Sequence, residues 1–273
     1  MSVLSLGQAL PLFLMIFVLG AVIGSFLNVC IYRIPEGLSV IRPRSRCPHC
    51  GTAIKWYHNL PILSWILLKG QCAYCGTGFS VRYPLVEALN GFLFVLFFYR
   101  FAFHPVTPVI WLLSATLVVI SFIDLDHQII PDVISLPGVV VGFACSFLVP
   151  WVTWQESLTG ILLGGGSLML IALGYECVTK KEGMGFGDVK LLAMLGAFLG
   201  WPAIFPIIFF GSVLGTCVGV PLMLFNKADS KLALPFGPFL SVGALCHVFF
   251  VDRLDPLMRW YAEVLAYFLR NIW

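Results

Sequence analysis

Phe122-Ile123-Asp124-Leu125-Asp126 closes one apolar run of the chain, and Gly185-Phe186-Gly187-Asp188 opens another. Two further apolar runs, Ile129–Val149 and Leu158–Val178, lie between these segments, and each is long enough to cross a bilayer once. A chain that crosses twice returns to the side it left. We therefore expect the aspartates of the two segments to lie at helix ends on the same membrane face.

The composition is that of a polytopic membrane protein. Hydrophobic residues make up 60% of the 273 residues, charged residues only 11%, and the mean hydropathy is +0.97. Soluble domains carry about 25% charged residues, so they are excluded. The predicted fold class is all-α, with about eight transmembrane helices at Leu10–Ile31, Pro84–Phe103, Val109–Ile123, Ile129–Val149, Leu158–Val178, Val189–Phe205, Ile207–Phe225 and Phe236–Val251. Pro202 and Pro206 crowd the end of the sixth run, which predicts a short helix there or one that continues into the seventh.

Basic residues predict the orientation, because Lys and Arg stay on the cytoplasmic side of a bilayer. Twelve of the sixteen lie in alternate loops: seven from Arg33 to Arg82, three from Lys180 to Lys190, and Lys227 with Lys231. We expect the amino terminus outside and the aspartate pair facing the cytoplasm. The first apolar run has a basic loop after it and no basic residue before it, which favours an anchor over a cleaved signal peptide.

The loop after the first run contains two C-x-x-C knuckles, Cys47-Pro-His-Cys50 and Cys72-Ala-Tyr-Cys75, separated by 21 residues. Each knuckle turns two thiols toward one ion, so this spacing predicts a structural zinc site. Two disulfides or four unrelated thiols are the alternatives, and a reducing cytoplasm disfavours the disulfides. His49 is interpreted as a bystander, because four thiols already complete the coordination.

Two aspartates that share a site are typical of aspartic proteolysis, in which one is neutral, one is ionised and a water lies between them. The glycines before Asp188 leave room for a peptide backbone beside the carboxylate. Asp126, His127 and Asp132 follow Asp124 closely, and a solvated loop with an acid at a helix start explains Asp132 well. It explains Asp124 poorly, because that residue follows the apolar run directly.

Other polar and small residues leave alternatives open. Glu87 is either a capping charge at a helix start or a site residue. Small-xxx-small stripes at residues 160–164 and 211–219 serve close helix packing, within one chain in preference to a dimer. Pro235-Phe236-Gly237-Pro238 is an irregular turn at membrane depth, which we expect to be buried in protein or to line a cavity.

These motifs together resemble the type IV prepilin peptidases, the bifunctional leader peptidases and N-methyltransferases of bacterial pilus and type II secretion systems. The resemblance covers nearly the whole chain. It rests on Gly24-Ser25-Phe26-Leu27-Asn28-Val29, the cysteine knuckles, Asn59-Leu60-Pro61 through Ser64-Trp65, Arg82-Tyr83-Pro84-Leu85-Val86-Glu87, residues 124–132, Gly185–Asp188, and the Pro235–Pro238 turn. The G-x-G-D tetrapeptide alone is weak, since presenilins and signal peptide peptidases share it.

The resemblance implies a GxGD-type intramembrane aspartyl protease with Asp124 and Asp188 as catalytic residues. It implies cleavage of the short basic leader of prepilins and pseudopilins at the cytoplasmic face of the bacterial inner membrane. It also implies methylation of the new amino terminus by S-adenosylmethionine. No glycine-rich nucleotide motif is visible, so motifs do not locate the cofactor pocket. We place it between the zinc loop and the membrane, with Glu87 and Asn59 as candidates.

The expected organisation is an N-terminal transmembrane helix (residues 1–32), a cytoplasmic zinc-binding loop (33–82), a transmembrane peptidase core (83–251) and a C-terminal tail (252–273). The expected partners are prepilin or pseudopilin substrates and the lipid bilayer, with no nucleic acid. One alternative is another GxGD protease that cuts within helices. A second is a non-enzymatic transporter or assembly factor, although transporter acids usually lie near the middle of the membrane.

Overall fold

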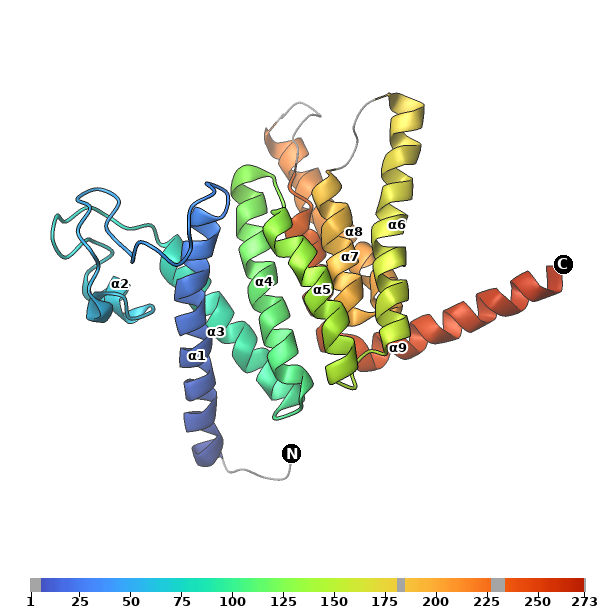
Figure 1. Ribbon diagram of the computed structural model, residues 1–273, viewed down its shortest axis with the longest axis horizontal. Coiled ribbons are helices and arrows are strands. Elements are labelled where there is room, and N and C mark those ends of the chain that lie inside the picture. Colours follow the sequence, from blue (N-terminus) through green and yellow to red (C-terminus); the bar gives the residue numbers. More distant parts are fainter. Residues whose placement is uncertain (1–5, 181–184, 227–233, 273) are drawn as a thin grey trace. The chain divides into compact units, whose positions relative to one another are not determined.

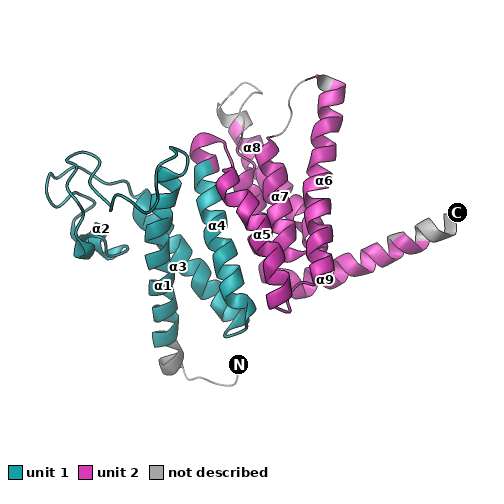
Figure 2. Ribbon diagram, in the orientation of Figure 1, with its two compact units in different colours: residues 1–123 teal, residues 124–273 magenta. Residues whose placement is uncertain are grey.

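The computed structural model describes residues 6–180, 185–226 and 234–272, and within them the regular structure is helical, apart from two isolated β-bridges in the cysteine loop. The elements in chain order are α1 (Leu6–Arg33), η1 (Trp56–His58), α2 (Leu63–Leu67), α3 (Arg82–Phe101), α4 (Val106–His127), α5 (Asp132–Leu148), α6 (Trp154–Thr179), α7 (Phe186–Leu199), η2 (Trp201–Ala203), α8 (Ile204–Asn226) and α9 (Gly237–Ile272) (Figure 1). The chain forms two compact units, residues 1–123 and 124–273, which meet in sequence just before the last turn of α4 (Figure 2).

In unit 1, glycines bring α1 and α3 into close contact. A Cβ atom added at Gly24 would lie 2.8 Å from the Cα of Glu87, so no larger residue fits there without a shift of the backbone. The Asn90 side chain donates a hydrogen bond of 2.7 Å to the carbonyl of Gly20, and Asn28 donates one of 3.1 Å to the carbonyl of Tyr83. Small residues and buried amides therefore hold the two helices together, as they do inside membranes.

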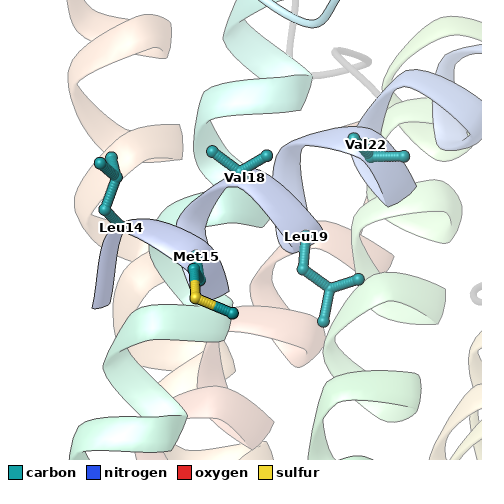
Figure 3. A pocket seen from close by; sticks show the side chains of 5 residues that line it. All are labelled: Leu14, Met15, Val18, Leu19 and Val22. Carbon is teal, nitrogen blue, oxygen red and sulfur yellow. The ribbon is translucent and has the colours of Figure 1, made fainter. Parts of the chain in front are cut away.

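The opposite side of α1 is apolar and open. Figure 3 shows five side chains that project from this helix away from α3: Leu14, Met15, Val18, Leu19 and Val22. Each of them is between 47% and 69% exposed. A helix that is hydrophobic all round and unburied on one side fits contact with lipid.

Unit 2 contains α5 to α9 and the last turn of α4, and α7 packs between α5 and α6. A Cβ added at Gly164 of α6 would lie 2.6 Å from the Leu192 carbonyl oxygen of α7, and Gly160 contacts Gly196 in the same way. Gly211 of α8 packs on Phe239 of α9. The predicted use of the small-residue stripes for packing within one chain is confirmed.

Among the described residues, six helices are long and apolar enough to cross a membrane: α1, α3, α4, α6, α8 and α9. All eight predicted runs form helices, but α5 has 17 residues and α7 only 14. Fourteen helical residues span about 21 Å, less than the roughly 30 Å of a hydrocarbon core. Of the two alternatives for the sixth run, the short helix is found, since α7 ends at Leu199 before Gly200 (φ 77°) and the 3-10 turn η2. The predicted end at Phe205 is wrong, because Ile204 and Phe205 already belong to α8.

Residues 252–273, predicted as a tail, continue α9 as far as Ile272, with non-helical backbone at Phe250. Arg259 in this part of α9 forms an ion pair with Glu156 at the start of α6. Lys181, Lys227 and Lys231, which contributed to the predicted orientation, lie outside the described residues.

Candidate active site and metal centre

Asp124 is held by the start of a helix far away in sequence. It lies in the last turn of α4 and is only 5% exposed. Its Oδ2 accepts a hydrogen bond of 2.9 Å from the backbone N–H of Gly237, the first residue of α9. The first N–H groups of a helix lack partners inside the helix and carry a partial positive charge, so this contact favours the ionised carboxylate.

Gly237 has no room for a side chain. A Cβ atom at this position would lie 2.7 Å from Asp124 Oδ2 and 3.3 Å from Ile130 Cδ1. Within the Pro235–Pro238 turn, Gly237 is thus buried against the carboxylate, whereas Pro235, Phe236 and Pro238 are half-buried.

Asp188 lies in the first turn of α7, just before the apolar run that begins at Val189 and outside the six membrane-length helices. It is close enough to Asp124 for the two charges to repel each other. Burial and this repulsion raise the pKa of Asp188 to about 7. Within unit 2, the structure therefore brings the two predicted aspartates together.

Ile130 fixes the spacing of these segments. A Cβ at Gly187 would lie 2.9 Å from the Cβ of Ile130, so this glycine of the G-x-G-D motif is required by internal packing. Gly185 differs, because the nearest atom to a Cβ there is Asp188 Oδ2 at 3.9 Å.

The other acids near Asp124 have different environments. Asp132, the first residue of α5, forms an ion pair with Lys190 of α7, whose Nζ lies 2.7 Å and 2.8 Å from the two carboxylate oxygens. Asp126 and His127 are exposed. Asp132 therefore has a partner that neutralises it, whereas the charge nearest in effect to Asp188 is the like charge of Asp124.

This arrangement suits proton exchange between two carboxyl groups. Asp124 receives a backbone N–H that favours its anion, and the raised pKa of Asp188 keeps a proton on that acid near neutral pH. One ionised and one protonated carboxyl group are the requirement for activating a water and an amide carbonyl together.

The four knuckle cysteines also converge. The sulfur atoms of Cys47, Cys50, Cys72 and Cys75 all lie within 4.8 Å of one another. Each knuckle closes in the same way: the N–H of its first cysteine donates to the carbonyl of Thr52 or Thr77, at 2.9 Å and 2.8 Å. Gly51 and Gly76 follow the second cysteines with φ of 70° and 72°, the left-handed region that favours glycine.

The surroundings of Cys50, Cys72 and Cys75 lower the pKa of their thiols and so favour thiolates, the form that binds metal, whereas the pKa of Cys47 is raised. The hydroxyls of Thr52 and Thr77 lie 3.4 Å and 3.3 Å from the sulfurs of Cys50 and Cys75 and lower the pKa of both thiols. A four-sulfur donor set with no other group inserted fits a closed tetrahedral zinc site.

Glu87 and Asn59, the two candidate cofactor residues, lie in unit 1 on one cavity. Glu87 is 8% exposed, and its Oε2 accepts a hydrogen bond of 2.7 Å from the N–H of Ile62. It is not a capping charge, because its carboxylate contacts the cysteine loop and not the first turn of α3.

Sequence reasoning missed the link from Gly237 to Asp124 and the one from Ile62 to Glu87. The contact from Gly237 to Asp124 had a signal in the sequence, because an irregular Pro-Phe-Gly-Pro turn at membrane depth is expected only where it packs against protein or lines a cavity. The second had none: Ile62 has φ 61°, an unusual conformation for a β-branched residue, within a stretch that reads as ordinary apolar loop.

Comparisons with known proteins cover both the region of the cysteine knuckles and the region of the two aspartates. Residues 18–101 match the bacterial peptidase A24 N-terminal domain, and residues 111–220 match the type IV leader peptidase family. The chain is 44% identical over 217 residues to the prepilin leader peptidase/N-methyltransferase of Myxococcus xanthus, covering 78% of this chain and 64% of that relative. It is 34% identical to the protein of the same name from Stutzerimonas stutzeri, covering 90% of this chain and 93% of the relative. No solved structure matches the chain.

Proposed function

The chain belongs to the type IV leader peptidase family, and from this premise we propose that it is a membrane aspartic endopeptidase and N-methyltransferase acting on prepilins and pseudopilins. It removes the short basic leader and methylates the new amino terminus. The proposed architecture is of the GxGD type, with α5 and α7 as short membrane-embedded helices beside six full spans. The proposed site of action is the cytoplasmic face of the bacterial inner membrane.

The proposed catalytic residues are Asp124 and Asp188. Asp124 begins as the anion, because the Gly237 N–H and the start of α9 stabilise its charge. Asp188 begins protonated, because burial and the neighbouring charge raise its pKa to about 7. The two acids titrate as a coupled pair, so this assignment describes the dominant microstate at neutral pH.

The chemistry then follows from the positions of the protons. Asp124 removes a proton from a water as its oxygen attacks the scissile carbonyl carbon, and Asp188 gives its proton to the carbonyl oxygen. In the second step Asp124 passes its proton to the leaving nitrogen while the C–N bond breaks. Asp188 recovers a proton from the diol hydroxyl, which completes the new carboxyl group and restores the dyad.

The cysteine cluster is proposed to hold a structural zinc ion through Cys47, Cys50, Cys72 and Cys75. All four donors are thiols, so no coordination position is left open for a substrate. The ion would stabilise a loop that exposes Leu38, Ile41 and Trp56 and buries few apolar side chains of its own.

The second activity requires a methyl donor, proposed to be S-adenosylmethionine. When bound, this cofactor supplies a methyl group to the amine lone pair: the N–C bond forms, the C–S bond breaks to leave a neutral thioether, and the amine gives up a proton. The chain must therefore accommodate a cation that becomes neutral, beside an amine that must first be deprotonated. Glu87 and Asn59 are the proposed cofactor-binding residues, on the cavity they share.

The observation that carries the peptidase proposal is the pairing of Asp124 and Asp188 inside unit 2, with one carboxylate bonded to Gly237. Purified protein would be incubated with a prepilin that retains its leader and with S-adenosylmethionine, and the products followed by intact mass. Asp124→Asn and Asp188→Asn are expected to leave the leader uncut. Asp132→Asn is the matched control, because that acid is paired with Lys190.

Each rival proposal has its own outcome in this experiment. Cleavage within the apolar helix of the substrate, away from the leader junction, would indicate a different GxGD protease. Normal processing by both dyad variants would indicate a non-enzymatic assembly factor or transporter. Methylation of a supplied mature pilin by variants that do not cleave would show that the two sites are separate.

A further inference from the structure

The last part of α9 differs in composition from the part that packs in unit 2. The whole helix has 36 residues and is about 54 Å long, well beyond the roughly 30 Å of a hydrocarbon core. Its first section, residues 237–251, carries no Asp, Glu, Lys or Arg. Charged residues recur from Asp252 onward, just after the non-helical backbone at Phe250. We call residues 252–272 the tail helix; in Figure 2 it extends away from the other helices of unit 2.

The tail helix begins at the end of unit 2 that lies away from the dyad. α9 starts at Gly237, beside the dyad, and runs from there toward the tail helix. α7 also starts at the dyad, and near its other end the carbonyl of Ala197 accepts a hydrogen bond of 2.7 Å from the Ser157 hydroxyl at the start of α6. The ion pair between Arg259 and Glu156 places the tail helix at this same end. With the dyad facing the cytoplasm, the tail helix lies at the outer face.

One side of the tail helix is polar and is tied to the helices of unit 2. Asp255 Oδ1 lies 3.2 Å from His247 Nε2, so this contact joins the two sides of the backbone break. Arg259, one turn later, forms the ion pair with Glu156. Glu263 follows after another turn, and residues four apart share a side of a helix. These contacts fix which side of the tail helix faces unit 2.

The opposite side carries an apolar stripe that is rich in aromatic residues. Its members recur at the spacing of one helix face, namely Leu257, Trp260, Tyr261, Val264 and Tyr267. Leu257 comes two positions after Asp255, which is about 200° around the helix, so the stripe and the polar side face in opposite directions. Trp260 and Tyr261 are 60% and 59% exposed, and Tyr267 is 68% exposed. Arg253 is the exception on this side; it lies in the first turn, where a long side chain reaches the headgroups.

The chemistry of the stripe fits the headgroup region of a bilayer. Trp and Tyr are enriched at membrane–water interfaces, because their rings are apolar and their N–H or O–H groups are polar. The charges of the tail helix balance, with three acidic and three basic residues: Asp252, Asp255, Glu263, Arg253, Arg259 and Arg270. Attraction to anionic lipids requires a surplus of Lys and Arg. Burial of the apolar stripe must therefore supply the binding energy.

We propose that the tail helix is an interfacial helix that lies in the outer leaflet, with its apolar stripe buried among the headgroups and upper acyl chains of zwitterionic phospholipids. A bilayer surface fits better than a second copy of the chain, because the stripe continues directly from a helix long and apolar enough to cross the membrane. Through Arg259 and Glu156 the tail helix then holds the start of α6 at the outer surface. This inference depends on neither of the two proposed activities.

The test uses the full-length protein in nanodiscs of phosphatidylcholine. A genetically encoded fluorescent amino acid replaces Tyr261 in one variant and Glu263 in the matched control. The two positions lie about 200° apart around the helix, and both are exposed, so the probe does not enter a core. Thermal unfolding of both variants is first compared with that of wild type. The quenchers are aqueous iodide, a lipid with a nitroxide near its headgroup, and a lipid with a nitroxide near the end of its acyl chain.

The probe that replaces Tyr261 is expected to lose more fluorescence to the headgroup nitroxide than to the chain-end nitroxide, and to be shielded from iodide. The probe that replaces Glu263 is expected to lose its fluorescence to iodide and little to either lipid. Both results should persist at high salt and when phosphatidylglycerol is added, because the tail helix has no net charge to attract an anionic surface.

Four results would overturn the proposal. Equal quenching of both probes by iodide would place the stripe in water. Stronger quenching by the chain-end nitroxide would show that the helix continues through the bilayer. Shielding from iodide without quenching by either lipid would show that protein covers the stripe, and energy transfer between two labelled chains would identify that protein as a second copy. Quenching that requires phosphatidylglycerol or disappears at high salt would show that electrostatic attraction, not apolar burial, holds the tail helix.

Discussion

Gly237→Ala is the substitution that tests most directly how the start of α9 positions the carboxylate of Asp124. The new Cβ would lie 2.7 Å from Asp124 Oδ2 and 3.3 Å from its Cγ. Neighbouring atoms pack at about 3.5–4.0 Å, so the carboxylate must move by more than half an ångström. That movement stretches or breaks the 2.9 Å hydrogen bond from the Gly237 N–H.

The expected magnitude follows from this one contact. A hydrogen bond to a charged group is worth about 1.5–3 kcal/mol, which corresponds to a rate loss of about 10- to 150-fold. We expect kcat for leader cleavage to fall by this factor while KM changes little, because Gly237 contacts Asp124, the proposed catalytic base, and is not proposed to contact the substrate. The S-adenosylmethionine affinity is expected to stay unchanged, since its cavity lies in unit 1.

The assay is cleavage of a prepilin followed by intact mass, with thermal unfolding measured in parallel. Gly174→Ala is the matched control, because a Cβ there meets no atom within 4 Å. If Gly237→Ala cleaves as fast as Gly174→Ala, the bond from α9 does not position the catalytic base. A loss of activity that tracks a loss of folded protein would also contradict the reasoning.

Three further outcomes are expected. The pKa of Asp188 is raised to about 7, so its proton is present below that pH and lost above it. The value of kcat/KM for cleavage should therefore fall about tenfold per pH unit above about pH 8. A pH profile that stays flat to about pH 9 would contradict the assignment of Asp188 as the acid. Purified protein should contain one zinc per chain by elemental mass spectrometry. Cys72→Ser should lose both the metal and S-adenosylmethionine binding. Full S-adenosylmethionine binding by metal-free protein would show that the cofactor site does not depend on the zinc site. The Asp132–Lys190 pair is 57% and 30% exposed, so Asp132→Asn should cost less than about 1 kcal/mol of stability and retain cleavage, and inactivity of that variant would place Asp132 in the catalytic machinery.

Local patterns in the sequence determined much of this protein. Apolar runs predicted every long helix, because a segment in lipid must satisfy its backbone internally whatever its neighbours are. Two apolar runs lie between Asp124 and Asp188, which predicted that both acids lie at the same membrane face. The cysteine knuckles are equally local, since four residues and a following glycine already direct two sulfurs toward one point.

What the tertiary structure decided are contacts between residues far apart in the chain. Gly237 is 113 positions from Asp124, and Ile62 is 25 positions from Glu87. Neither pairing leaves a periodic signal, because each consists of one backbone N–H that happens to meet one carboxylate when helices pack. Such contacts decide which acid is neutralised by Lys190. The proposed roles of the two aspartates and the proposed place of the methyl donor depend on them as well. The sequence by itself thus predicted which acids and thiols form the two candidate sites, and only the packing of helices and loop decided which residues contact each of them.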